Sequence, residues 1–404
     1  MSEKMYDAIV VGAGPGGSAA AYYLARQGAR VLLLDKAEFP RDKTCGDGLT
    51  PRAVAVLDEM GLLPEIKPRA AVVRSMVVVS PSGARTEVAI PSRPGVPDYA
   101  LVVPRVYLDD VIRARALAVG VAFRGGLRVA NVEGGNGEVL VTARGKGAAV
   151  SFRGRVAVLA TGANMKLLRG LGVLRSEPDV VLAARAYYEG LPDLEAAMHF
   201  RFDHVPLPGY AWIFPLPDGA ANVGIGHWPR GKKTRRESTL STLQNFVRAG
   251  ALQPVFGAAR RVGPVKGFPI RTDFLTARTF GPGFLLVGEA AGLVNPLTGE
   301  GIDYALESGR MAAEFLGERL DRGGFTPQEL AEYDARLRAH FGPLFRFSER
   351  VRKLGMSATR LDLLTRLANR RDDLKLLLTN LLLGTQTIPE RITPRMVMKV
   401  IMGR

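Results

Sequence analysis

The stretch DAIVVGAGPGGSAAAYYLARQGARVLLLD, residues 7–35, decides the fold of this chain. An apolar run leads into the spaced glycines Gly12, Gly14 and Gly17, and a helical stretch and a second apolar run follow. Gly12 permits a tight turn, Gly14 lets the backbone approach a pyrophosphate, and Gly17 lets the helix pack closely on the strand. This order predicts a βαβ unit that binds a dinucleotide at the start of its helix.

The acid at the end of the second apolar run strengthens this prediction. Asp35 follows Gly17 by 18 residues, close to the roughly 20 expected for a carboxylate that binds a ribose hydroxyl. We expect the N–H groups and the positive dipole end of the helix to face the phosphates. The first group of predicted cofactor-binding residues is therefore Gly12, Gly14, Pro15, Gly16, Gly17, Asp35 and Lys36.

The composition fits a globular protein of about two or three domains. Of the 404 residues, 47% are hydrophobic and 23% are charged, as in ordinary globular chains. The one cysteine, Cys45, rules out an intramolecular disulfide and fits a reducing compartment. The four histidines show no metal-ligand spacing, so we predict no metal site.

The net charge of +16 is compatible with a solvated Arg-rich surface, an anionic membrane surface or a nucleic acid. The basic residues are scattered and no nucleic-acid motif is present, so we expect no nucleic acid partner. The sequence shows no signal peptide, and no run reaches the ~18 apolar residues that a spanning helix needs. We expect a cytoplasmic protein, with peripheral contact at the inner face of the cell membrane as an open alternative.

The order of helical and strand patterns indicates an interrupted nucleotide domain. Alternating, strand-rich segments separate the first βαβ unit from a second glycine-rich βα unit at residues 284–320. This order is typical of flavin proteins, whereas plain nicotinamide dehydrogenases keep the fold contiguous. We predict an α/β protein whose Rossmann-type FAD-binding domain (1–70, 100–175 and 270–325) is interrupted by an antiparallel β-sheet substrate domain (71–99 and 176–269), with a helical C-terminal region (326–404).

The C-terminal region is helical, leucine-spaced and basic. Residues 326–404 hold 15 Lys and Arg against 8 Asp and Glu. Its leucines recur at the spacing of one helix face. Two interpretations stay open: helices that lie on anionic lipid, or a helical lid that completes the core.

A second motif lies in the late βα unit. It reads GEAAG at residues 288–292 and continues with Gly299-Glu300-Gly301-Ile302. Glu289 can cap the ribityl or pyrophosphate part of a flavin cofactor, and a helix that starts near Gly301 can aim its N–H groups at the flavin N1–C2=O edge. The second group of predicted cofactor contacts is Gly288, Glu289, Gly299, Gly301 and Ile302.

Three segments carry a resemblance to a known family: FPRDKTCGDG (39–48), PGYAWIFP (208–215) and NPLTGEGI (295–302). Over residues 5–320 the chain resembles the geranylgeranyl reductase family within the flavin hydroxylase-like superfamily. CGDGLTPRAV (45–54) places it nearest to the bacterial menaquinone reductases. The resemblance implies an FAD-dependent oxidoreductase that saturates isoprenoid double bonds in a geranylgeranyl lipid, a chlorophyll side chain or a menaquinone tail.

The resemblance also implies roles for individual residues, each with a plainer alternative. Arg105 matches the family arginine that meets the cofactor, or it is a surface arginine at a helix start. Cys45 lies near the isoalloxazine ring, or it is an inert buried thiol. Tyr210 and Trp212 line an isoprenoid pocket, or they are core aromatics. The third group of predicted cofactor contacts is Cys45, Gly46, Arg105, Thr161 and Gly162.

The chain departs from the family pattern at three places. Glu289 stands where an aspartate is usual, Thr161 replaces the aspartate of a common Ala-Asp-Gly, and Leu207 replaces a proline of the archaeal aromatic motif. None of these substitutions argues against FAD. The last one leaves the identity of the substrate open.

The chemistry of an isolated alkene sets the expected mechanism. Such an alkene is not electrophilic, so hydride from flavin N5 needs a proton delivered at the less substituted carbon. The proton donor is Cys45, Tyr210 or a bound water, and the predicted catalytic residues are Cys45, Tyr210 and Trp212. We expect the external electron donor to be NAD(P)H or a reduced carrier protein.

Two rival functions share parts of this sequence pattern. A flavin monooxygenase or halogenase keeps the same fold, but the Trp-x-Trp-x-Ile-Pro motif expected of such a halogenase is missing from the sequence. A monooxygenase consumes oxygen in step with its substrate, whereas a reductase works anaerobically. A non-catalytic, flavin-containing lipid or RNA binder is the third possibility.

Overall fold

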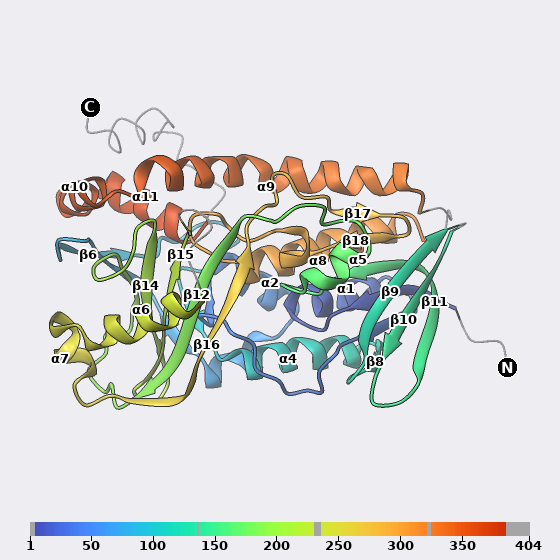
Figure 1. The fold of residues 1–404 in the computed structure, drawn as a ribbon, viewed down its shortest axis with the longest axis horizontal. Coiled ribbons are helices and arrows are strands. Elements are labelled where there is room, and N and C mark those ends of the chain that lie inside the picture. Colours follow the sequence, from blue (N-terminus) through green and yellow to red (C-terminus); the bar gives the residue numbers. More distant parts are fainter. Residues whose placement is uncertain (1–4, 136, 230–235, 321–324, 385–404) are drawn as a thin grey trace.

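The computed structural model describes residues 5–135, 137–229, 236–320 and 325–384 (Figure 1). Its first sheet contains the predicted βαβ unit: β1 (Tyr6–Val11), α1 (Pro15–Arg26) and β2 (Val31–Leu34). β1 pairs in parallel with β2 on one side and with β11 (Ala149–Leu159) on the other. The apolar run in β1 is completely buried, as expected of a central parallel strand covered on both faces.

The full order of the first sheet is β17-β18-β11-β1-β2-β8, with a β9–β10 hairpin attached to β11. The late βα unit thus returns to the sheet through β18, which pairs in parallel with β11. Its helix α8 (Ile302–Gly317) packs against α1. The remaining strands of this sheet are β8 (Ala122–Arg124), β9 (Arg128–Gly135), β10 (Glu138–Arg144), β17 (Phe280–Gly281) and β18 (Phe284–Leu286).

The second sheet has the order β16-β12-β15-β14-β13-β5-β6 and is antiparallel except for the β13–β5 pair. Strands from two distant parts of the chain meet in it, because β5 and β6 precede the rest by about a hundred residues. α6 and α7 lie beside this sheet, away from the first one (Figure 1). Its strands are β5 (Ser75–Val79), β6 (Arg85–Ala89), β12 (Val180–Glu189), β13 (Met198–Arg201), β14 (Gly209–Leu216), β15 (Ala220–His227) and β16 (Arg260–Arg271).

A short antiparallel sheet of β3 (Gly48–Leu49), β7 (Ala100–Val102) and β4 (Ala71–Val73) completes the strands. The mixed α/β class, with a Rossmann-type core, antiparallel sheets and C-terminal helices, is confirmed. The residue bounds of the domains stay a prediction. The other helices before the C-terminal region are α2 (Pro51–Glu59), α3 (Leu63–Ile66), η1 (Lys67–Arg69), α4 (Arg105–Ala118), α5 (Met165–Gly170), α6 (Arg236–Arg248), η2 (Gly250–Leu252), α7 (Gln253–Phe256) and η3 (Gly288–Ala291).

Residues 326–384 of the C-terminal region form α9 (Pro327–Gly355), α10 (Ala358–Ala368) and α11 (Asp372–Leu382), and α9 runs along the length of the molecule (Figure 1). The rest of the predicted helical region, 385–404, lies outside the described residues. The predicted leucine face is largely turned inward. Its leucines pack in one cluster with the aromatic strand β14, and the buried ones are Leu364, Leu374, Leu377, Leu378 and Leu381. This burial favours the lid interpretation. Within the described ranges, no helix is long and apolar enough to cross a membrane.

Candidate active site

A cavity of about 480 Å³ lies between the first and second sheets. It is lined by the carboxyl ends of β1 and β2, the start of α8 and residues of β12 and β14, as expected for a ligand site at the edge of a parallel sheet. The structure brings every predicted site residue to this cavity except Gly17. The lining residues that were predicted are Gly12, Gly14, Pro15, Gly16, Asp35, Lys36, Cys45, Gly46, Arg105, Thr161, Gly162, Tyr210, Trp212, Gly288, Glu289, Gly299, Gly301 and Ile302.

The glycine loop has the close approaches that its spacing predicts. Gly12 has φ +106, and a Cβ there would lie 2.3 Å from the carbonyl oxygen of Ala160. A Cβ on Gly17 would lie 1.8 Å from the carbonyl oxygen of Gly12, so Gly17 serves helix–strand packing rather than the cavity. The N-cap Gly14 has no side-chain cap, and the first turn of α1 carries no acid. The helix start is therefore suited to an anion.

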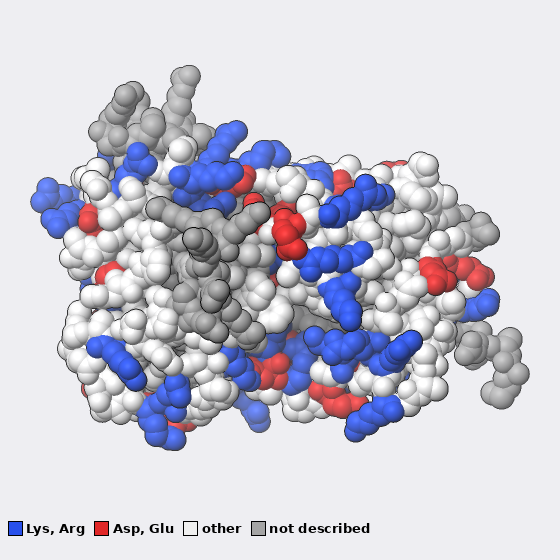
Figure 2. Space-filling view, viewed as in Figure 1, with Lys and Arg blue, Asp and Glu red and all other residues white. Residues whose placement is uncertain are grey.

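Basic side chains gather around this part of the cavity. Lys36, Arg41, Lys43 and Arg128 all line it. Burial lowers the pKa of the Lys36 ammonium, and the positive charge of Arg128 lowers it further. Figure 2 shows that Lys and Arg outnumber Asp and Glu on this face of the molecule. A pyrophosphate bound here would relieve the mutual repulsion of these cations.

The two predicted acids already make contacts within the protein. Asp35 accepts hydrogen bonds from the N–H groups of Ala13 and Ala37, both at 2.8 Å. Glu289 pairs with Lys43 at 3.3 Å and accepts from the Arg271 N–H at 3.3 Å. These contacts hold both carboxylates at the cavity wall.

The start of α8 differs from the expectation in one respect. The N–H groups of Gly301 and Ile302 donate to Glu300 Oε1, at 3.0 and 2.7 Å. The helix start thus carries its own carboxylate, where the sequence predicted N–H groups aimed at a cofactor. Burial raises the pKa of Glu300, and these N–H donors oppose that rise.

Arg105 is not a surface arginine, because only 2% of it is exposed. It forms a two-point contact with Asp109 at 2.6 and 2.8 Å, and Arg41 pairs with the same Asp109 at 2.8 Å. Burial is the largest influence on the pKa of the Cys45 thiol and raises it, whereas the positive charge of Arg105 lowers it. Arg105 therefore links the cofactor-facing part of the cavity with Cys45.

An aromatic wall closes the other part of the cavity. The side chains of Tyr210 and Trp212 are 6.1 Å apart between ring centroids, those of Trp212 and Phe214 are 6.3 Å apart, and Phe200 lies 5.3 Å from Phe214. These rings are both core and cavity lining, so the two interpretations of the aromatic motif are compatible. The Tyr210 hydroxyl donates to the carbonyl oxygen of Thr298, and burial raises its pKa.

We call these two parts the dinucleotide half (the glycine loop, Asp35, Glu289 and the basic residues around them) and the aromatic half (Phe200, Tyr210, Trp212 and Phe214). Cys45 lines the same cavity as both halves.

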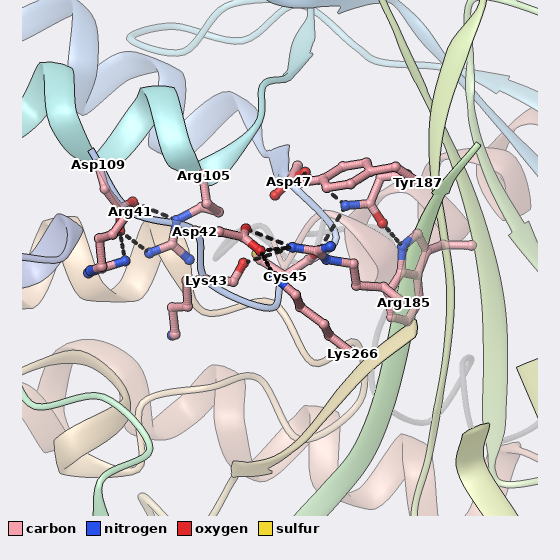
Figure 3. Close-up of polar contacts among 12 residues, drawn as sticks. Arg41, Asp42, Lys43, Cys45, Asp47, Arg105, Asp109, Arg185, Tyr187 and Lys266 are labelled. Carbon is pink, nitrogen blue, oxygen red and sulfur yellow. Dashed lines mark hydrogen bonds and ion pairs between the residues drawn. The ribbon is translucent and has the colours of Figure 1, made fainter. Parts of the chain in front are cut away.

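Sequence reasoning assigned no role to Asp47, which the structure places beside Cys45. Asp47 is fully buried, and its Oδ2 accepts from the Tyr187 hydroxyl at 2.6 Å and from Asn222 Nδ2 at 2.8 Å (Figure 3). Asp47 lies in the triplet Gly46-Asp47-Gly48, but the partners that give it a role lie 140 and 175 residues further along the chain. The position of Asp47 between two glycines was the only feature of the sequence that could have indicated a role for it.

The residues present fit FAD. The dinucleotide half offers a helix start without an acid and several lysine and arginine side chains. It also offers a buried Thr161 hydroxyl oxygen that has no hydrogen-bond partner among the described residues. An unsatisfied buried hydroxyl in a cavity wall is suited to a polar ligand. The aromatic half offers apolar surface, as a flavin ring and an apolar substrate require. The fold and the cavity thus fit a protein that binds a flavin dinucleotide beside an apolar pocket.

Comparison with known proteins agrees with this class. The chain belongs to the FAD binding domain family, which it matches over residues 5–348. It is 37% identical to the menaquinone reductase of Mycobacterium tuberculosis, over 81% of this chain and 80% of that protein. It is 33% identical to digeranylgeranylglycerophospholipid reductase 1 of Methanopyrus kandleri, over 86% of this chain and 90% of that protein.

A solved structure, a geranylgeranyl bacteriochlorophyll reductase-like protein from Thermoplasma acidophilum, has the same fold. Its TM-score to this chain is 0.82 at 24% identity, and the match covers 99% of this chain and 96% of that one. The resemblance to geranylgeranyl and menaquinone reductases is confirmed, and the protein is an FAD-dependent oxidoreductase.

Proposed function

We propose that this protein is an FAD-dependent reductase that saturates isoprenoid carbon–carbon double bonds of a lipid. The observation that carries this proposal is one cavity with two chemically different halves, a dinucleotide half and an aromatic half. The names of the relatives, menaquinone reductase and digeranylgeranylglycerophospholipid reductase, support it. A geranylgeranyl lipid, a chlorophyll side chain and a menaquinone tail are the substrate classes to test.

The predicted cofactor residues are proposed to hold FAD, with Gly17 acting through helix packing. When bound and reduced, FAD supplies a hydride at its N5 position. The dinucleotide half orients the cofactor through main-chain N–H groups and cations. The aromatic half excludes water and holds the alkene. An apolar wall is suited to this because an isoprenoid chain has no group that could hydrogen-bond with a buried polar side chain.

The protein's remaining task is to deliver a proton to the alkene. Of the two predicted side-chain donors, Tyr210 already donates its hydrogen to Thr298. Cys45 lines the cavity, and because burial raises its pKa it keeps its proton at neutral pH. We therefore propose that Cys45 is the proton donor and that Tyr210 and Trp212 shape the pocket.

A lipid assay without oxygen tests the function. Purified holoenzyme, reduced anaerobically by dithionite, is incubated with each substrate class, and the lipid products are analysed by mass spectrometry. A gain of two hydrogens for each saturated bond supports the proposal. Product that forms only with oxygen, with oxygen consumed in step, identifies a monooxygenase instead.

The external electron donor is proposed to be NAD(P)H or a reduced carrier protein. The sequence contains no second intact dinucleotide fingerprint, so a nicotinamide donor would bind without one. Anaerobic bleaching of the flavin absorbance with NADPH, NADH or reduced ferredoxin distinguishes these donors. Bleaching by none of the three excludes them all.

Peripheral membrane contact is proposed through the basic surface of the C-terminal region. Arg346, Arg350 and Lys353 are exposed on α9 at the spacing of one helix face. The triple Gln variant is expected to lose flotation with anionic vesicles while keeping FAD. Equal flotation of variant and wild type would exclude this surface.

A further inference from the structure

Asp47 is a fully buried carboxylate whose two oxygens have different surroundings. Oδ2 accepts from Tyr187 and Asn222, whereas Oδ1 has no hydrogen-bond partner among the described residues. A proton on this carboxyl therefore resides on Oδ1, where no acceptor holds it. The residue also has φ 66, a left-handed conformation that is uncommon outside glycine. Such a conformation persists when the surroundings fix it.

The surroundings of Asp47 also fix Cys45. Asn222 Nδ2 donates to the Cys45 carbonyl oxygen at 2.8 Å as well as to Asp47 at 2.8 Å. Trp212 Nε1 donates to Asn222 Oδ1 at 3.0 Å and so sets which way the amide points. The Asp47 N–H is itself hydrogen-bonded to the Cys45 sulfur. One amide thus ties the carboxyl, the thiol loop and the aromatic half together.

Burial raises the pKa of both the Asp47 carboxyl and the Cys45 thiol. Burial raises the pKa of Asp47 to about 6, while hydrogen bonds from Tyr187 and Asn222 and the positive charges of Arg185 and Arg105 oppose that rise. Burial raises the pKa of Cys45 as well, and the nearby charge of Asp47 adds to this, against Arg105. A Cys45 thiolate therefore has a higher proton affinity than the Asp47 carboxylate.

Polar and charged side chains pack one beside the next between Asp47 and the surface. Tyr187 is half-buried and packs beside Arg185, whose guanidinium carbon lies 4.3 Å from the Tyr187 ring centre. Arg185 contacts Asp42 at 2.7 Å, and the partly exposed Lys266 contacts Asp42 at 2.6 Å (Figure 3). The other titratable or charged groups that face the Cys45–Asp47 pair are Lys43, Arg105 and Tyr210.

Resting on the proposed alkene reduction, we propose that Asp47 is a positioning residue that acts through Cys45 and returns a proton to its sulfur after each turnover. The Cys45 S–H bond breaks, and its proton and the alkene π electrons form a C–H bond at the less substituted carbon. Reduced FAD, when bound, would supply the hydride for the second C–H bond and would be left oxidised. The Asp47 O–H bond then breaks and the S–H bond re-forms, as the proton crosses the cavity that both residues line. Solvent then reprotonates Asp47, which itself lines the cavity.

The first test uses FAD-loaded Asp47→Asn, with Asp98→Asn as the matched control. Asp98 forms a surface ion pair with Arg74 and is half-exposed. Cys45 is the sole cysteine of the sequence, so the pH dependence of alkylation by iodoacetamide reports its pKa alone. Removing the like charge is expected to lower that pKa and speed alkylation about threefold at neutral pH. Asp98→Asn is expected to leave the profile unchanged.

The second readout separates proton return from structure. In Asp47→Asn the first turnover uses the proton already on Cys45, so it is expected to stay near the wild-type rate, while later turnovers slow roughly tenfold. A role in folding alone would slow all turnovers alike. An unchanged alkylation profile in FAD-loaded Asp47→Asn, or equal slowing of first and later turnovers, overturns the proposal.

A second variant covers the case in which Asp47→Asn does not fold. Tyr187→Phe keeps the ring but removes the hydrogen bond that lowers the pKa of Asp47. The wild-type rate is expected to fall as the pH rises through about 6, where Asp47 loses its proton, and this fall moves to higher pH in Tyr187→Phe. An unmoved profile overturns the proposal. Alkylation needs no substrate, so it tests the Asp47–Cys45 pair even if no isoprenoid is reduced.

Discussion

The two halves of the cavity are built by different means. The centre of the dinucleotide half is the glycine loop, which depends on main-chain geometry within one short stretch, with Gly12 and Gly17 in contacts that admit no side chain. The aromatic half depends on side chains from β13 and β14, whose positions are set by a sheet that joins distant parts of the chain. We infer that the first half tolerates almost no change at Gly12 and Gly17, whereas the second half can be reshaped without loss of the cofactor.

The largest expected effect comes from breaking the dinucleotide half at Gly12. In Gly12→Ala the new Cβ meets the Ala160 carbonyl at 2.3 Å, in a strained conformation at φ +106. We expect the protein to lose bound FAD, measured as the ratio of flavin to protein absorbance after purification. Gly28→Ala is the matched control, because it has φ +86 but no atom within 4 Å of its Cβ. It should keep FAD and cost about 1–2 kcal/mol of stability; FAD retained in Gly12→Ala would contradict the loop assignment.

The next largest effect is expected on the proton supply. Cys45→Ala should slow alkene reduction by about 10³-fold, within the range of general acid catalysis, while FAD content changes little. Anaerobic turnover and flavin content measured on the same preparation check this. Tyr210→Phe should cost less, since the Tyr210 hydrogen is already donated to Thr298. Equal activity of Cys45→Ala and wild type would discard Cys45 as the donor.

A smaller effect is expected from enlarging the aromatic half. Phe200→Ala should raise KM about tenfold by removing part of the wall, and should cost about 3–5 kcal/mol of stability. Phe246→Ala is the control, because Phe246 is fully buried in a separate cluster of the second sheet and does not line the cavity. It should lose similar stability with KM unchanged. The same KM rise in both variants would show that the wall acts only through stability.

The same contrast explains what the sequence could predict. The glycine loop, Asp35 and the late motif could be predicted because each is recognised from residues that are close together in the sequence. The structure brings them to one cavity. The roles of Tyr187 and Asn222 could not be predicted, because they exist only where β12 and β15 meet the Cys45 loop. Glu300 illustrates a second limit: its position was plain, but its hydrogen bonds to the α8 start depend on a side-chain conformation. Sequence motifs therefore predict sites built from the main chain well. They predict networks of side chains from distant parts of the chain poorly.

The smallest expected effect concerns the clamp that ties the C-terminal region to the core. Glu307 contacts Arg52 at 2.9 and 2.6 Å, and Arg52 also donates to the Gly384 carbonyl oxygen at 2.8 Å. Burial raises the pKa of Glu307, but hydrogen bonds from His340 and Arg52 outweigh burial and hold it at about 2, below its ordinary value of 4.5. This lowered pKa contributes stability that is present above pH 4.5 and is lost as the pH falls toward 2.

Allowing for the partly exposed His340, the contribution is on the order of 2 kcal/mol. Urea unfolding of wild type and Glu307→Gln across this pH range measures it. The wild type should lose its advantage over the variant as the pH falls, because protonation makes the two side chains alike in charge. If the clamp holds α11 over the aromatic half, the variant should also raise KM at neutral pH with FAD content unchanged. A stability difference that does not vary with pH would show that the Arg52–Glu307 pair contributes through packing rather than charge.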